Sequence, residues 1–456
     1  MTTPAVPLPY GSHAVPRPYE SYVYAYPHKT AYRPLADRPA LRELWAGERK
    51  DALSLYLHIP FCEVRCGFCN LFTRIGAPDE LTTRYLDALD RQATAVRDAL
   101  DGPDGPGAPR FAAAAFGGGT PTFLTAGELE RLCDIAEKRM GADLRAVPLS
   151  VETSPATATA DRLAVLADRG ATRLSIGVQT FVGAEAKAAV RPQRRAEAEA
   201  ALGRIRDARI PVLNIDLIYG IDGQTEASWR HSLDAALAWQ PEELYLYPLY
   251  VRPLTGLGRL GAGGDAAWDA QRLRLYRQGR DHLLGHGYEQ VSMRMFRRPG
   301  SPAQGADDYA CQTDGMIGLG CGARSYTSAL HYSFDYAVDM REIRAIIDTY
   351  TATEDFSRAE VGRRVDGDEA RRRHLLQSLL QSRGLEVAEY RERFGSAPAE
   401  DFPAELDRFA ALGWLDEGAD PGLLRLSPEG LAHSDALGPA LFSPAVRAAM
   451  AAYLPK

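Results

Sequence analysis

Three closely spaced cysteines are the residues of this chain whose types and spacing point most clearly to chemistry. Cys62, Cys66 and Cys69 are separated by three and then two residues, and they follow the apolar run 53–59. One short loop with this spacing can bend its thiolates around a single iron-sulfur cube. Three thiolates leave one iron without a protein ligand, so that iron can hold a small molecule. The cofactor chemistry that uses this arrangement is reductive cleavage of S-adenosylmethionine (SAM).

Zinc binding and incidental thiols are the alternatives for these cysteines. Zinc sites usually combine two couplets of ligands, and the sequence has no second couplet. The remaining cysteines, Cys133, Cys311 and Cys321, are scattered along the chain. Cys133 falls on the apolar face of a predicted helix that begins with a Thr125–Glu128 capping box, which favours a place in the core. We therefore interpret the three-cysteine loop as a 4Fe-4S site.

A repeated pattern of strand, loop and helix begins at residue 51. Consecutive units of this kind imply a parallel α/β sheet, curled into a barrel or part of one. Polar or glycine residues stand at or just beyond the carboxyl ends of the strands, which is the end where a parallel barrel assembles its chemistry. The six predicted strands cover residues 53–59, 111–116, 149–152, 173–178, 212–216 and 244–249, and the residues at their ends include Cys62, Gly117 to Thr120, Glu152, Gln179 and Asp216.

The length of 456 residues predicts a main domain with appendages. Residues 1–50 are rich in proline and tyrosine and are expected to form an extended arm, because prolines prevent a long helix. Residues 51–260 form the predicted core and 261–345 an extension, with one strand over 288–296 and a glycine-rich turn over 318–323. Residues 346–456 have a different rhythm, with short helices followed by a strand at 423–426.

Charge and hydropathy restrict the partners and the location. The net charge of −7 argues against nucleic acid as the main partner. The run Arg371 to Arg373 is expected to be a solvated helix face. The sequence has no apolar stretch of membrane-spanning length and no apolar core like that of a signal peptide at its start. Reduced cysteines fit a reducing compartment, so we expect a cytoplasmic location.

The segment from Tyr56 to Cys69 resembles the radical SAM superfamily. The motif Tyr-x-His-Ile-Pro-Phe before Cys62-x-x-x-Cys66-x-x-Cys69 is similar, more narrowly, to the branch of oxygen-independent coproporphyrinogen III oxidase. That branch also contains haem chaperones and class C radical SAM methylases. The resemblance covers nearly the whole chain. It implies a partial (β/α)6 barrel with a winged-helix-like C-terminal domain. A lid or docking role is favoured there over DNA binding, because a basic recognition helix is missing.

The resemblance also implies cofactors and partners. They are a 4Fe-4S cluster, one SAM or two, a small-molecule substrate, and an electron donor such as flavodoxin or ferredoxin. The implied SAM residues are Gly118, Gly119 and Thr120 for the amino group, Glu152, Gln179 for the ribose, Arg191 for the carboxylate, Asp216, and Phe68 for the adenine. An ordinary tight turn and a surface arginine are the alternatives for the glycine motif and for Arg191. Bare glycine backbone lets a ligand approach closely, and a guanidinium binds a carboxylate bidentately.

Tyr56 is a further candidate catalytic residue, because the equivalent tyrosine of the porphyrinogen oxidases lies near the cluster and a second SAM. Tyr56 and His58 share one face of a strand, and a pair buried in the core is the alternative. Leu71 stands where those oxidases have a fourth cysteine. This difference argues against propionate decarboxylation, and the sequence from Gly318 to Ala323 is closer to the chaperone form.

Three functions remain after these comparisons of residues. The leading hypothesis is a radical SAM enzyme that abstracts hydrogen from a small-molecule or tetrapyrrole-like substrate, or from the methyl group of a second SAM. A haem chaperone is the second. Haem binding needs an axial ligand, for which the 9 histidines and Cys321 are candidates. Oxidation of coproporphyrinogen III by a dehydrogenase is the third.

Overall fold

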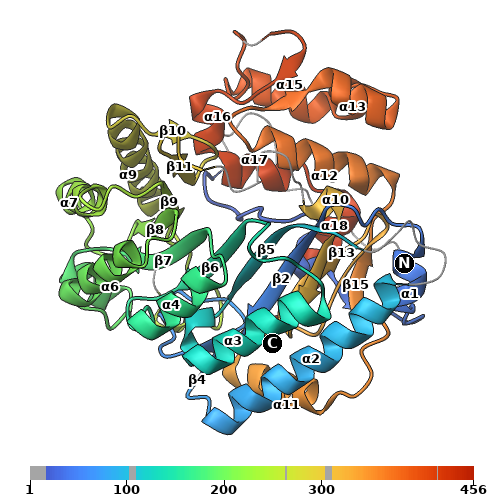
Figure 1. Cartoon of the computed structure of the whole chain (residues 1–456). Coiled ribbons are helices and arrows are strands. Elements are labelled where there is room, and N and C mark those ends of the chain that lie inside the picture. Colours follow the sequence, from blue (N-terminus) through green and yellow to red (C-terminus); the bar gives the residue numbers. More distant parts are fainter. Residues whose placement is uncertain (1–16, 102–108, 262–263, 303–310, 419) are drawn as a thin grey trace.

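The structure is a computed structural model that describes residues 17–101, 109–261, 264–302, 311–418 and 420–456. Its centre is a curved sheet in which six consecutive strands pair side by side and parallel (Figure 1). They are β2 (Leu53–Ile59), β5 (Phe111–Gly118), β6 (Leu149–Thr153), β7 (Arg173–Gln179), β8 (Val212–Tyr219) and β9 (Glu243–Pro248). The predicted α/β fold with a partial six-fold barrel is confirmed.

Helices cover the outside of this sheet, one after each strand (Figure 1). α3 begins with the predicted capping box, in which Thr125 accepts from Glu128 N–H and the Glu128 side chain accepts from Thr125 N–H. Its inward residues Leu129, Leu132 and Cys133 are fully buried. The outer helices are α2 (Asp79–Leu100), α3 (Ala126–Asp134), α4 (Ala160–Asp168), α6 (Arg195–Asp207), α7 (Glu226–Leu237) and α9 (Ala266–Gly285). The last of them, α9, lies in the region predicted as an extension, yet it is the sixth outer helix of the barrel.

The sheet continues beyond both edges of the barrel. β12 (Met316–Leu319) lies parallel to β2, and it contains Gly318, so the predicted turn at 318–323 is a strand end followed by a turn. Residues 288–296 form two short strands instead of the one predicted, because the chain reverses between them. The added strands are β13 (Arg324–Tyr326), β14 (Leu330–Ser333), β15 (Val361–Arg364) and β1 (Arg33–Pro34) on one side, and β11 (Met295–Arg297) and β10 (Glu289–Gln290) on the other.

The predicted boundary at residue 346 falls inside helix α11 (Met340–Ala352). Ile343, Ile347 and Tyr350 of this helix are buried in the same core as the barrel, and β15 continues the main sheet, so the main core extends to about residue 365. A second hydrophobic core follows, formed mainly by residues 375–446 and joined by Tyr26 and Ala31. It supports a separate C-terminal unit, whose winged-helix character stays a prediction.

The C-terminal unit consists of short helices and one small ribbon, drawn in orange and red in Figure 1. The ribbon pairs two antiparallel strands of two residues each. The elements are α12 (Gly367–Leu379), β16 (Leu385–Glu386), α13 (Val387–Phe394), α14 (Pro398–Asp401), α15 (Pro403–Ala411), β17 (Leu423–Leu424), α16 (Pro428–Ala432), α17 (Ser434–Ala440) and α18 (Pro444–Ala451).

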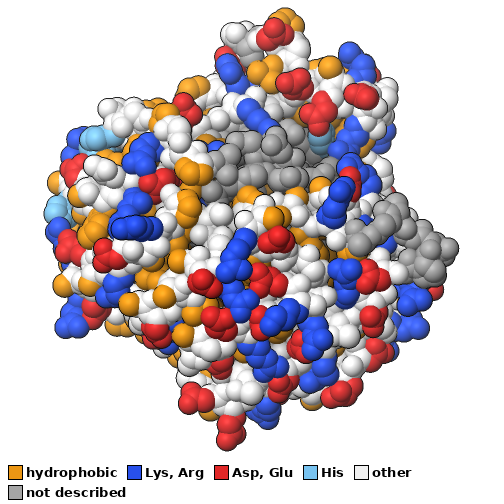
Figure 2. Space-filling view, in the orientation of Figure 1, with side chains coloured by type: hydrophobic (Ala, Val, Ile, Leu, Met, Phe, Trp, Pro, Cys, Tyr) orange, Lys and Arg blue, Asp and Glu red, His pale blue; other side chains and the backbone are white. Residues whose placement is uncertain are grey.

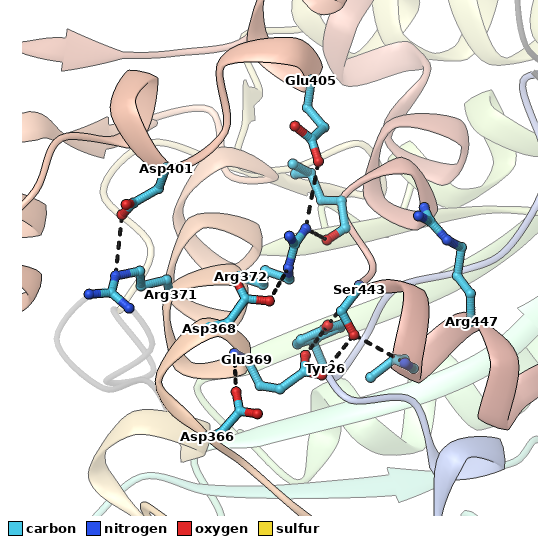
Figure 3. Close-up of polar contacts among 12 residues, drawn as sticks. Tyr26, Asp366, Asp368, Glu369, Arg371, Arg372, Asp401, Glu405, Ser443 and Arg447 are labelled. Atoms are coloured by element: carbon cyan, nitrogen blue, oxygen red, sulfur yellow. Dashed lines mark hydrogen bonds and ion pairs between the residues drawn. The ribbon is translucent and has the colours of Figure 1, made fainter.

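The N-terminal arm connects the barrel to these C-terminal helices. Its first 16 residues lie outside the described part of the chain. Tyr26 is buried, and its hydroxyl donates to the carboxylate of Glu369 and accepts from Ser443 N–H at 3.1 Å (Figure 3). The arm is not extended throughout, because Leu41–Ala46 form helix α1, which buries Trp45.

Charges of both signs are interspersed on the face of the molecule shown in Figure 2. The run from Arg371 to Arg373 is not a solvated face, contrary to the prediction. Arg372 pairs with Asp368 at 2.8 Å and donates to the carbonyl of Leu441, and Arg373 is buried against His331 at 3.0 Å, because α12 packs between β14 and the C-terminal helices. Within the described ranges, no helix is both long enough and apolar enough to span a membrane.

Candidate active site

The three-cysteine loop follows β2 and is closed by two short parallel strands, β3 (Phe61–Cys62) and β4 (Arg74–Ile75). Each thiol has a polar neighbour. Cys62 Sγ lies 3.4 Å from Thr120 Oγ1, Cys69 Sγ lies 3.9 Å from Thr73 Oγ1, and Arg191 Nη1 donates to Cys66 Sγ at 2.9 Å. The loop therefore contacts the glycine turn on one side and the segment after β7 on the other.

Gly67 holds the middle of this loop against the barrel, a role that sequence reasoning missed. Its N–H donates to the carbonyl of Ala189 at 3.1 Å, and its carbonyl accepts from Leu257 N–H at 2.7 Å. A Cβ atom at this position would lie 2.7 Å from the Cβ of Val190, which is closer than two carbon atoms approach without contact strain. Only glycine fits between these neighbours.

The three thiols of the loop are free, and their sulfur atoms are not gathered around one point as they would be on a single zinc ion. The three sulfurs do not all lie within 4.8 Å of one another. Thiolates on one tetrahedral zinc would be about 3.8 Å apart, given Zn–S bonds of about 2.3 Å. Burial raises the pKa of Cys62 to about 12, with the neighbouring cysteines adding to the effect. The Cys62 thiol therefore stays protonated until a metal displaces the proton.

The glycine turn at the end of β5 packs directly on the cysteine loop. Gly119 N–H donates to the carbonyl of Ile59 and Thr120 N–H to that of Phe61, both at 2.8 Å. A Cβ on Gly119 would lie 3.0 Å from Cys62 Sγ. Gly118 has φ +115°, and a Cβ there would meet the ring of His58 at 2.6 Å. Both the backbone conformation and the available space therefore require glycine here.

A cavity of about 170 Å³ opens beside this turn at the ends of the strands. Glu152 faces it and accepts from Gly118 N–H at 3.0 Å. Asp216 accepts from Asn214 Nδ2 at 2.7 Å and from Ser175 Oγ at 3.2 Å. The lining residues are Tyr56, Ala115, Phe116, Gly117, Ser150, Glu152, Arg173, Ser175, Asn214, Asp216, Tyr245 and Tyr247.

The two carboxylates of the cavity are electrostatically unusual. Desolvation raises the pKa of Glu152 to about 7 and that of Asp216 to about 6. Solvent reaches the Glu152 side chain through the cavity. The protein around the cavity nevertheless reduces the hydration of the carboxylate, which is why its pKa is raised. Arg173 also lines the cavity, and its Nε bonds Glu243 at 2.7 Å. The acids thus hydrogen-bond neutral groups, an arrangement suited to a ligand with a positive charge or hydroxyl donors.

The structure brings most of the predicted site residues together in two groups. Direct contacts join Cys62, Gly118, Gly119, Thr120 and Glu152. A second group comprises Cys66, Arg191 and Gln179, because Arg191 also donates to the carbonyl of Gly177, and a Cβ on Gly177 would lie 2.6 Å from Gln179 Nε2. Gln179 has φ +70°, at an irregularity in the pairing of β7 and β8. Arg191 is therefore at the site and not on a remote surface.

The remaining predicted site residues lie outside these two groups. Asp216 lines the cavity, as described above, and Phe68 and Tyr56 have other surroundings. Phe68 packs on a small apolar cluster that includes Ile218 and Leu257. Tyr56 lines the cavity, and its hydroxyl lies 3.2 Å from His58 Nδ1. Burial lowers the pKa of His58 to about 4, so this histidine is neutral. Tyr56 is thus part of the cavity wall and also a partner of a buried histidine.

Sequence reasoning missed several cavity residues that lie on the same strands. On β7, Arg173 and Ser175 come before Gln179. On β8, Asn214 comes two residues before Asp216. On β9, Tyr245 and Tyr247 are two residues apart. Side chains two residues apart on a strand point to the same face. A polar residue at every second position of an otherwise apolar strand was the signal that could have identified them.

Comparison with known proteins agrees with this geometry. The family model described as the radical SAM superfamily matches residues 56–236. The chain is 35% identical to the oxygen-independent coproporphyrinogen III oxidase of Paracoccus denitrificans over 283 residues, which is 60% of this chain and 60% of that enzyme. It is 25% identical to the heme chaperone HemW of Bacillus subtilis over 79% of this chain and 92% of that protein.

A solved structure shows the same fold over most of the chain. The coproporphyrinogen III oxidase HemN of Escherichia coli matches with a TM-score of 0.76 and 22% identity, covering 91% of this chain and 96% of that one. Proteins with a radical SAM domain hold a 4Fe-4S cluster and SAM, and they generally need a reductant and a substrate. The chain therefore contains a radical SAM domain, and its relatives include oxygen-independent coproporphyrinogen III oxidases and haem chaperones.

Proposed function

We propose that the chain is an enzyme that cleaves SAM reductively and modifies a small-molecule or tetrapyrrole-like substrate. The observation that carries this proposal is that the glycine turn after β5 connects the cysteine loop to the wall of the cavity. Thr120 lies against Cys62, and Gly118, two residues earlier, donates its N–H to Glu152. When bound, the cluster and SAM would supply a 5'-deoxyadenosyl radical that abstracts hydrogen.

The residues of the chain then have separate tasks. The bare backbone of Gly118 and Gly119 and the carboxylate of Glu152 would hold the amino group of SAM. Asp216 and Gln179 are suited to its hydroxyl groups, and Arg191 to its carboxylate. Phe68 would contact the adenine. Closure of the cavity by Tyr56, Tyr245 and Tyr247 would keep water away from a reactive intermediate.

The reaction class depends on what shares the cavity with this SAM. A second SAM beside Tyr56 would make the chain a methyltransferase, whereas a tetrapyrrole would make it an oxidoreductase. Leu71, in place of a fourth cysteine, favours a reaction other than propionate decarboxylation. We propose that a flavodoxin or ferredoxin supplies the electron and that the protein acts in the cytoplasm.

A haem chaperone or a coproporphyrinogen III dehydrogenase in porphyrin metabolism is the alternative. The names of the relatives favour it. The surroundings of Cys321 disfavour this residue as an axial ligand of haem, because its side chain is fully buried and its sulfur lies 3.8 Å from the hydroxyl of Tyr85. A haem ligand would have to be one of the histidines.

The test is to incubate the anaerobically reconstituted protein with SAM and dithionite and to measure 5'-deoxyadenosine by mass spectrometry. We expect slow formation of 5'-deoxyadenosine and methionine without any substrate. Cys66→Ala should abolish both this activity and the visible absorption of the cluster. Cys133→Ala, which changes a cysteine of the core, should retain them.

The other outcomes distinguish the candidates. S-adenosylhomocysteine formed together with 5'-deoxyadenosine would assign a second SAM as methyl donor. Stoichiometric haem binding without any 5'-deoxyadenosine would replace the enzyme by the chaperone. Retention of iron and sulfide after all three loop cysteines are changed to alanine would contradict the cluster site itself.

A further inference from the structure

Two histidines and an aspartate meet on the outer surface of the barrel, and none of them lines the cavity. Asp234 lies near the end of α7, and His282 and His286 lie at the end of α9. Their potential ligand atoms all lie within 4.8 Å of one another. Figure 2 shows histidine side chains at the surface on the side where Figure 1 places α7 and α9. We propose that this triad binds one divalent transition-metal ion and thereby clamps the two helices together.

A backbone carbonyl fixes the tautomer of His286. Its Nδ1 lies 2.8 Å from the backbone carbonyl of His282. A carbonyl only accepts hydrogen bonds, so Nδ1 carries the proton and Nε2 of the neutral ring has a free lone pair. Metal-bound histidines usually donate their second N–H in this way, which fixes both the tautomer and the ring orientation.

His282 and Asp234 already share the position that a metal would take. His282 Nε2 lies 2.7 Å from Asp234 Oδ1. Ligands of one tetrahedral zinc are about 3.3 Å apart, because Zn–N and Zn–O bonds are about 2.0–2.1 Å. This pair must therefore open by about 0.6 Å, and His286 must approach by up to about 1.5 Å. Asp234 and His286 are exposed, so rotation of their side chains provides both movements.

The spacing along the helix supports the same conclusion. Residues four apart lie on one helical face, and the rings of His282 and His286 are 4.4 Å apart between centroids. Two imidazoles and one carboxylate, with water in the fourth position, are a ligand set that zinc accepts.

The helices joined by this clamp belong to the units of β8 and β9. α7 and α9 already contact through Trp229, whose Nε1 donates to the carbonyl of Leu275 at 2.9 Å. The ion would add a second connection near the carboxyl ends of both helices. It would thereby fix the relative position of the units that contribute Asp216 and Tyr245 to the cavity.

The clamp is tested by measuring how much zinc the cluster-loaded protein binds. Other loosely bound metals are first removed with a chelator resin. Equilibrium dialysis should show about one zinc per chain at micromolar concentration, and zinc should raise the melting temperature. His286→Gln and Asp234→Asn should weaken zinc binding about tenfold or more and remove the shift in melting temperature. His231→Gln is the matched control, because His231 lies on α7 and its Nε2 is 3.0 Å from Arg195.

Several outcomes would overturn the clamp. Equal zinc uptake by His286→Gln and the parent protein would do so, as would the absence of binding up to about 100 μM zinc. Repeating the titration with all three loop cysteines changed to alanine excludes zinc at the cluster loop. Melting temperatures without zinc show whether each variant is folded. Suppose that the variants and the parent melt at the same temperature without zinc and that zinc does not change the melting temperature of the parent. The triad then only forms a hydrogen bond between the helices and binds no metal.

Discussion

Two networks of acids, one at a buried junction and one in the cavity, differ in what their carboxylates contact. At the junction of the barrel with α17, Asp435 is 1% exposed and forms an ion pair with Arg294, and it also accepts from Tyr250 at 2.6 Å. In the cavity, Glu152 and Asp216 hydrogen-bond neutral donors. An arginine forms an ion pair with Asp435, whereas the hydrogen-bond partners of Glu152 and Asp216 are neutral. The difference fits the proposal that Asp435 holds the fold, whereas Glu152 and Asp216 bind SAM.

Neutralising the acid of the junction should have the largest effect. Asp435→Asn leaves the guanidinium of Arg294 buried without a counter-charge, which should cost about 3–5 kcal/mol of stability. Thermal melting of the cluster-loaded protein measures the loss. Glu199→Gln, which removes an exposed ion pair with Arg195, is the control and should cost less than about 1 kcal/mol. A change as small as that of the control would mean that Arg294 is not held by Asp435.

Neutralising an acid of the cavity should raise the stability of the protein instead of lowering it. Because desolvation raises the pKa of Asp216 to about 6, this carboxyl stabilises the ligand-free fold below its ordinary pKa of 3.8, and that stability is lost as the pH rises through 6. Asp216→Asn should therefore be more stable than the parent at pH 8, by at most about 3 kcal/mol. The gain should disappear below about pH 4.

Melting temperatures of both proteins between pH 4 and pH 8, without SAM, measure this effect. The affinity for SAM should fall in the same variant, because the neutral amide is a poorer acceptor for its donors. A variant that is less stable than the parent at pH 8 would place Asp216 with the structural acids, and the distinction between the two networks would fail.

Removing one hydroxyl at the arm should have the smallest effect. Tyr26→Phe leaves Glu369 and Ser443 without the donor and the acceptor between them, which should cost about 1–3 kcal/mol (Figure 3). The matched control is Tyr32→Phe on the same arm, where the buried hydroxyl has no hydrogen-bond partner among the described residues. That variant should melt at or above the temperature of the parent. Equal losses in both variants would mean that the network with Glu369 contributes no more than packing.

Local sequence patterns predicted the parallel strands and the cysteine loop because both depend on short segments, whereas the partial barrel and the SAM residues came from the family resemblance. The strands, the capping box at Thr125 and the cysteine loop each lie within a few consecutive residues. The additional strands of the sheet were not predictable in this way, since β12 joins β2 across about 260 residues of sequence. The burial of Arg373 and the role of Gly67 likewise depend on distant partners, which no single sequence window contains.

The backbone contacts of Gly67 have a consequence for how the protein matures. Its backbone hydrogen-bonds Ala189 and Leu257, so the cysteine loop is attached to two other parts of the barrel through contacts that do not involve the thiols. In zinc fingers, by contrast, the metal itself drives folding. We therefore expect the polypeptide to complete its tertiary structure first, and the machinery that delivers iron and sulfide to meet a finished receptor rather than a nascent chain.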